Sequence, residues 1–341
     1  MARRPRIKVK SHAAAYHVVS RVSQQEYRLS DYMKGVIANK LISLKSLYFC
    51  HLISFCILDS HVHAMIAMDS PEDIDENEAM ERWNRYHEKQ YRLNPNVEAY
   101  RKYVVNALTD ISRFMKKLNL LITNAYNRHT GKVGTLWQSR FHSTIFERGI
   151  PILQGSAYIE LNSFRASLVK RPEDYEYSSL YHLRQGNPGG LIDIEYLEEG
   201  LCISELHKGL TDKKAFTQEL YKTYLAYIYE AGSKPKGGKE HGIVITDEMK
   251  ARLQKYGIEG ERGSLLQRTW EYSKSIFVGG SDFAKRFYDD HINPGYTGRE
   301  REEHIQKWLH ASGEKLWSVF SVFNQGLPEE KRRRLPSRDG P

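Results

Sequence analysis

The sequence predicts an α+β fold in which an antiparallel sheet carries helices packed on it. Short β-branched or continuously apolar runs at residues 15–22, 48–58 and 61–68 are typical of strands. Apolar residues at helical spacing lie between and after them, at residues 30–47 and 109–127. Strands that alternate with helices indicate one sheet covered by helices, in either an α/β or an α+β arrangement.

The first elements follow from their composition. Residues 15–22 (AYHVVSRV) predict a strand, and residues 30–47 predict a helix that Ser30 or Asp31 can cap. The compact apolar run YFCHLISFCIL predicts a buried strand. A turn or bulge at Asp59-Ser60 separates it from HVHAMIAM, which predicts a second strand paired with YFCHLISFCIL.

The middle of the chain is expected to be mainly helical. Residues 71–108 are polar and helical in pattern, with Pro95 as an interruption, and the amphipathic helix 109–127 ends before a turn. A loop then runs into a strand within residues 134–147. Residues 151–169 begin with proline and predict another helix.

The last third of the chain has fewer signals. Residues 232–242 are rich in Gly, Lys and Pro and predict a linker. Residues 243–325 carry aromatic positions, Phe277 among them, that favour a helical core of unknown role. The basic tail 326–341 is expected to be disordered.

Composition limits the possible partners. The 341 residues carry a net charge of +9, which favours a polyanion such as nucleic acid or an anionic membrane, although a basic enzyme would look the same. No apolar run approaches the ~18–20 residues that span a bilayer. The N-terminus does not resemble a signal peptide, so we expect a cytoplasmic protein. The three cysteines, Cys50, Cys56 and Cys202, predict buried free thiols.

His61-Val62-His63 is a candidate metal site. On a strand, residues two apart point to the same face, so both imidazoles can hold one divalent cation while Val62 is buried on the other face. With 14 histidines in the chain, one such pair can also arise by chance.

Tyr158 and Asn162 are four residues apart on a predicted helix and therefore share a face. Tyr158 could be a nucleophile and Asn162 an oxygen ligand. The alternative is a core tyrosine with Asn162 capping the helix, since the chain has 22 tyrosines.

Two segments have the charge of a nucleic-acid surface. Residues 101–148 contain nine Lys or Arg against two acids, with aromatic residues between them. This composition suits single strands, because cations bind phosphate and aromatic rings stack on bases. Residues 1–10 carry five cations and no acid. They could form either a solvated tail or an arm that binds DNA phosphates.

These motifs, in this order, resemble the single-tyrosine HUH transposases, in particular the REP-associated tyrosine transposases. Sequence motifs of that family are similar to LDSHVH at 58–63, to YNRHTG and GTLWQSRF within 126–141, and to YIELNSFRASLV at 158–169. The resemblance covers residues 14–185. Asp59-Ser60 replaces the usual Pro-Asn and Ser163-Phe164 the usual Pro-Val, and residues 72–105 look longer than the family's connection.

The resemblance implies an HUH endonuclease-like, ferredoxin-like sheet, with Tyr158 as nucleophile and His61, His63 and Asn162 as ligands of Mg²⁺ or Mn²⁺. We expect a catalytic domain at 1–190, followed by a helical extension at 191–231. The implied partner is single-stranded or hairpin DNA, bound by a monomer or a homodimer. The residues expected to contact DNA are Arg3, Arg4, Arg6, Arg21, Arg113, Lys116, Lys117, Arg128, Trp137 and Arg140.

Three other functions stay open at this point. A replication-initiator-like nickase shares the metal pair but differs in motif order. A catalytically silent DNA-binding protein of transposase descent would lack turnover, although its tyrosine and histidines are intact here. A cupin-like oxygenase also uses His-x-His, but no convincing partner pattern for it is present.

Overall fold

The computed structural model describes residues 9, 14–23, 29–201, 203, 212–233, 242–258, 277–291, 295, 297–301, 303 and 317–318. Its N-terminal half contains β1 (Ala14–Arg21), α1 (Asp31–Lys45), β2 (Cys50–Ile57), β3 (His61–Met68), η1 (Pro71–Asp73), α2 (Glu76–Tyr86), η2 (Lys89–Tyr91), α3 (Glu98–Leu108), α4 (Ile111–Thr130) and β4 (His142–Phe146). The strands and helices expected up to this point are confirmed.

The rest of the described chain is mostly helical. It contains α5 (Ile150–Glu160), α6 (Asn162–Arg165), η3 (Pro172–Asp174), α7 (Ser179–Arg184), η4 (Pro188–Gly190), α8 (Glu195–Leu201), α9 (Lys213–Gly232), α10 (Asp247–Lys255), β5 (Phe277–Gly279), α12 (Ser281–His291) and β6 (Trp317–Ser318). None of the described helices is long and apolar enough to cross a membrane.

The sheet has the strand order β2-β3-β1-β4-β5-β6. The pairs among β1 to β4 are antiparallel, as expected, and the order of these four strands is that of a ferredoxin-like βαββαβ unit. The pair β4–β5 is parallel, so the whole sheet is mixed. A parallel pair needs a long crossover, which the helices between β4 and β5 supply.

The strand at Phe277 differs from the helix that we expected there. Ile145 pairs with Phe277 and Phe146 with Val278, so this segment extends the sheet. The aromatic spacing fits a helix locally, but β4 leaves an open edge whose backbone groups need partners. α10 and α12 agree with the helical expectation for the region. The proposed domain boundaries stay predictions.

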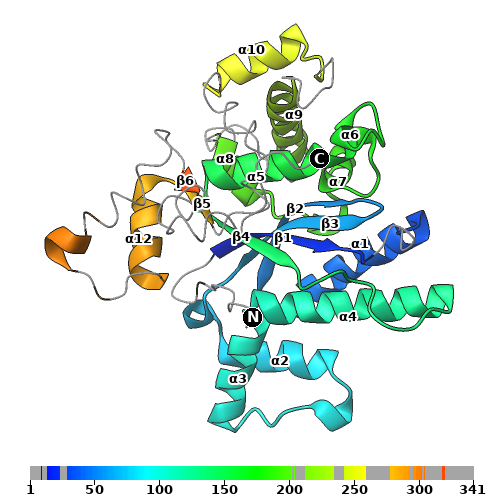
Figure 1. Ribbon diagram of the computed structural model, residues 1–341, viewed down its shortest axis with the longest axis vertical. Helices are drawn as coiled ribbons and strands as arrows, with labels where there is room; N and C mark the ends of the chain where they lie inside the picture. The colour runs from blue at the N-terminus through cyan, green and yellow to red at the C-terminus, as the bar shows by residue number, and fades with distance from the viewer. Residues whose placement is uncertain are drawn as a thin grey trace, which may run out of the picture.

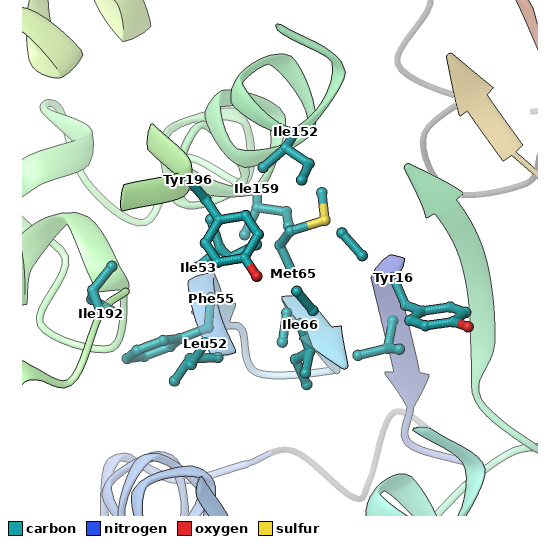
Figure 2. Close-up of a cluster of buried hydrophobic side chains, with 14 of the residues drawn as sticks. Tyr16, Leu52, Ile53, Phe55, Met65, Ile66, Ile152, Ile159, Ile192 and Tyr196 are labelled. Atoms are coloured by element: carbon teal, nitrogen blue, oxygen red, sulfur yellow. The ribbon is translucent and has the colours of Figure 1, made fainter. Parts of the chain in front are cut away.

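Helices cover both faces of the sheet (Figure 1). α1 and α4 pack together on one face, and α5 lies on the other, with α8 and α9 beyond it. Figure 2 shows Met65 of β3 pointing toward α5, where Ile152 and Ile159 meet it, while Ile66 points to the opposite face. α5 is buried between the sheet and the outer helices, so its side chains are fixed relative to β3.

Several expectations concern residues with little role in the site. Cys50 and Cys56 are buried free thiols, as expected, and Cys202 lies outside the described residues. So do residues 1–8, most of the predicted linker and the predicted disordered tail.

Candidate active site

The His-x-His pair lies on the face of β3 that α5 covers. His63 is paired with Val19 of β1, and His61 with Arg21. Alternation along β3 puts both imidazoles on the same side as Met65, and Val62 is buried on the opposite side. The predicted shared face of the two histidines therefore agrees with the register of the sheet.

A third histidine, His17 of β1, holds His63 in place. Its Nε2 lies 2.9 Å from Nδ1 of His63, and the two rings stack with their centroids 5.2 Å apart. His61 meets His63 edge-on at 4.8 Å between centroids. Among the described residues, Nε2 of His63 is a buried nitrogen atom without a hydrogen-bond partner.

The turn before His61 is firmly anchored. The backbone carbonyls of Asp59 and Ser60 accept from Leu29 (2.8 Å) and Val22 (2.9 Å). The buried ammonium of Lys34 lies 2.6 Å from Asp59. Ser60 Oγ lies 2.8 Å from Nδ1 of His61. The Asp-Ser pair that departs from the family's pattern thus orients His61 and leaves its Nε2 for a ligand.

Both histidines of the pair are neutral at neutral pH. Burial, and then the charge of Arg21, lower the pKa of His61 to about 4. Burial, and then the neighbouring His17 and His61, lower the pKa of His63 well below its usual range. A neutral imidazole is the form that binds a metal ion.

Tyr158 reaches this cluster from α5. Its ring is buried, with its centroid 6.0 Å from that of His63 and 5.8 Å from that of His17, edge-on to both. Gly155, one turn earlier, allows this approach, because a Cβ there would lie 2.6 Å from Met65 Cε. The guanidinium of Arg165 lies 5.3 Å from the centre of the Tyr158 ring.

Asn162 closes the end of α5 instead of continuing it. Its Nδ2 donates to the carbonyls of Tyr158 (2.9 Å) and Ile159 (3.2 Å), and α6 begins at this residue. The predicted helix 151–169 is therefore interrupted at Leu161, because a side-chain amide competes with the backbone ladder. This is the capping role that the sequence left open, and it directs the amide nitrogen to the end of α5.

The donor set fits a divalent metal in part. Within the described residues, no three His, Cys, Asp or Glu side chains converge on one point, so His17 supports His63 rather than adding a ligand. The unpartnered Nε2 of His63 and the Nε2 of His61 are the nitrogen atoms that could hold such an ion, and Asn162 as a further ligand stays a prediction. Such a mixed nitrogen and oxygen set leaves open positions for water and phosphate.

The residues expected to bind DNA fall into separate groups. Arg21 lies beside His61 on β1, and Arg140 is exposed in the loop that pairs with the end of β1, where Gln138 donates to the Arg21 carbonyl at 2.9 Å. Arg128 is exposed in the last turn of α4. Arg3, Arg4 and Arg6 lie outside the described residues.

Trp137 is placed for packing. It is buried, and its Nε1 donates to the carbonyl of Asn119 at 3.1 Å, which fastens the loop to α4. A ring with so little exposed surface offers no open face to a base.

His17 and Arg165 were missed as site residues in the sequence. His17 lies in the predicted strand 15–22, and Arg165 lies in YIELNSFRASLV, one of the motifs that carry the resemblance. Their roles depend on the β1–β3 register and on the turn after α5, which a single sequence does not specify.

No known family model matches the chain. No curated protein matches it either. Its structure is distantly similar to that of a REP-associated tyrosine transposase bound to a REP hairpin. The TM-score is 0.37 and the identity 14%, over 57% of this chain and 91% of that chain. A likeness at this level is too distant to establish a function.

Proposed function

We propose that the protein is a single-tyrosine DNA endonuclease and strand transferase that acts on single-stranded or hairpin DNA. The observation that carries the proposal is the meeting of Tyr158 with His63 across the α5–β3 contact, at 6.0 Å between ring centroids. A nucleophile and a pair of neutral histidines on facing elements are what a tyrosine phosphodiesterase needs.

Each side chain has a role in the proposed reaction. Tyr158 Oη attacks phosphorus while the bond from phosphorus to the 3′-oxygen breaks. The phenolic proton is lost to solvent, and the leaving oxygen takes up a proton as a 3′-hydroxyl. The 5′-phosphotyrosine keeps the energy of the broken linkage, so a new 3′-hydroxyl can reverse the step on another strand.

His61, His63 and Asn162 would hold Mg²⁺ or Mn²⁺. The bound cation would supply charge neutralisation at the scissile phosphate. Arg165, beside the Tyr158 ring, adds a positive charge where the phenolate develops. His17 holds the ring of His63 through its Nδ1, which favours Nε2 as the ligand atom.

A covalent-adduct assay tests the proposal. Labelled single-stranded and hairpin oligonucleotides are incubated with protein and Mn²⁺, and adducts are resolved under denaturing conditions. We expect Tyr158→Phe to abolish the adduct and to leave DNA binding within about two-fold, because the ring stays and only the nucleophile is lost. Tyr32→Phe is the matched control, since Tyr32 is 60% exposed and far along the chain from α5.

Two results would contradict the proposal. The first is an adduct that persists in Tyr158→Phe. The second is equal or faster cutting of a blunt duplex, because a stacked, paired backbone cannot easily bend into a narrow site between a strand and a helix.

A further inference from the structure

A cavity of about 500 Å³ lies between α2, α3 and α4. Leu47 and Tyr48, which follow α1, complete its wall. Its volume is within the range of small-molecule sites. Three of its aromatic side chains, Trp83, His87 and Tyr103, come from the segment 72–105, which the sequence marks as longer than the connection in the family that the chain resembles.

The cavity is separate from the tyrosine site. α4 packs on the sheet face opposite α5 (Figure 1). Phe114, Met115 and Leu118 of α4 are buried, whereas Arg113, Lys116 and Lys117 line the cavity. The helical period therefore divides α4 into an apolar side and a cationic side.

The lining combines aromatic rings with cations. The rings are Tyr48, Trp83, His87 and Tyr103, and the cations are Arg113, Lys116 and Lys117. No Asp or Glu is among the lining residues. A surface of cations and aromatic rings suits a ligand that is both planar and anionic.

The cations are not neutralised by carboxylates within the described chain. Arg113 donates to the hydroxyl of Tyr103 at 2.9 Å, and its guanidinium lies 4.8 Å from the centre of that ring. Lys117 lies 5.0 Å from the centre of the Tyr86 ring. Cations that contact aromatic rings, and not carboxylates, can still bind an anion.

Trp83 adds an unsatisfied donor. Its ring stacks on His87 with the centroids 4.2 Å apart and meets Tyr103 edge-on at 5.9 Å. Its indole nitrogen is buried and has no hydrogen-bond partner among the described residues. Because this nitrogen is covered, Trp83 lines the cavity through the rest of its ring.

We propose that this cavity binds one unpaired nucleotide of a DNA strand. The base lies against the rings of Trp83 and Tyr103, and its phosphate is held by Arg113, Lys116 and Lys117. The choice of a DNA strand, rather than a free nucleotide, rests on the proposed function. The aromatic walls favour a base over an acidic peptide, which offers the same charge without the rings.

Fluorescence anisotropy with hairpin oligonucleotides tests the proposal, in a Tyr158→Phe background that cannot cleave. Tyr103→Ala should weaken binding roughly five-fold or more, because one base stack is removed. Tyr103→Phe keeps the ring and should stay within about two-fold. An abasic substitution at the captured nucleotide should weaken wild-type binding by the same factor and have no further effect in Tyr103→Ala.

The cations are tested by salt dependence. Lys116→Gln with Lys117→Gln should lower the slope of log K against log salt by about 0.7 for each phosphate that the lysines no longer neutralise. Lys222→Gln is the matched control, because Lys222 is exposed on α9, on the α5 side of the sheet. Ultraviolet crosslinking of an oligonucleotide with 5-bromodeoxyuridine should label a peptide that contains Trp83 or Tyr103.

Several outcomes would overturn the proposal. They are unchanged binding by Tyr103→Ala, crosslinks found only elsewhere, and binding of dTMP or polyglutamate as tight as that of the oligonucleotide. If adducts form in the wild type and Tyr103→Ala binds normally, the cavity proposal fails alone. If no adduct forms but Tyr103→Ala binds weakly, the proposed function fails and the cavity stands.

Discussion

Gly155→Ala tests whether close packing of α5 on the sheet sets the position of Tyr158. A Cβ at Gly155 would lie 2.6 Å from Met65 Cε and from Phe146 Cε1, so at least the phenylalanine ring must move. Gly35 in α1 is the matched control, because a Cβ there meets nothing within 4 Å. The same substitution is thus made in two helices with opposite surroundings.

Two opposing effects set the expected changes in the free energy of unfolding. Alanine is better than glycine in a helix interior by about 1 kcal/mol, which applies at both sites. Overpacking a filled core costs about 1–3 kcal/mol, which applies only at Gly155. We therefore expect Gly35→Ala to raise the free energy of unfolding by about 1 kcal/mol. The free energy of unfolding of Gly155→Ala should be about 1–3 kcal/mol lower than that of Gly35→Ala.

Urea unfolding followed by circular dichroism measures both free energies, and the adduct assay measures the second consequence. Relief of the clash lifts α5 from β3, so Gly155→Ala should also slow adduct formation by Tyr158, whereas Gly35→Ala should not. Equal stabilisation by the two substitutions would refute the packing argument. A destabilised Gly155→Ala with an unchanged adduct rate would show that Tyr158 does not depend on this contact.

Two further predictions concern titration and metal binding. Asp193 and Asp69, 3.5 Å and 2.9 Å from the imidazole nitrogens, raise the pKa of His51 from 6.5 to about 9. The stability from this charged histidine is present below pH 6.5 and is lost as the pH rises through 9, so His51→Gln should be less stable than wild type by up to about 1 kcal/mol at pH 6 and no less stable at pH 10. Equal differences in urea unfolding at both pH values would contradict this. Mn²⁺ at about 100 times its dissociation constant should stabilise the wild type by about 2.7 kcal/mol in thermal unfolding. The substitution His63→Ala should remove this gain in stability. The substitution His17→Phe should weaken Mn²⁺ binding by about 10–100-fold, because His17 supports the ring of His63. A gain that survives in His63→Ala, or after EDTA is added, would contradict the assigned ligands.

Local sequence patterns predicted the elements of the site but not their contacts. Strand alternation placed His61 and His63 on one face of a strand, and helical spacing placed Tyr158 and Asn162 on one face of a helix. The partnership of His17 with His63 depends on the register of β1 against β3, and a slip of one residue would turn His17 to the other face. Periodicity within one segment carries no information about that register.

The same limit applies to two long-range features. Phe277 fits a helical aromatic pattern, yet it pairs with β4, because the open edge of a strand far back in the sequence decides its conformation. Residues 72–105 look like polar connecting helices. Only the folded structure shows that Trp83 and Tyr103 share a cavity with the cationic side of α4.

The two proposed DNA contacts, taken together, constrain the path of a bound strand. The tyrosine site lies between α5 and the sheet, and the cavity lies on the outer side of α4, so a strand that reaches both must pass around the sheet. Arg21 is exposed where such a path would begin, at the end of β1, and its neighbour Ser20 lies 3.3 Å from the side chain of Asn119 on α4. From Asn119 to Arg113, α4 rises by about 9 Å, which adds to the path around the sheet. The captured nucleotide must therefore lie several nucleotides from the scissile phosphate, and shortening the unpaired segment between them should abolish the effect of the abasic substitution before it abolishes cleavage.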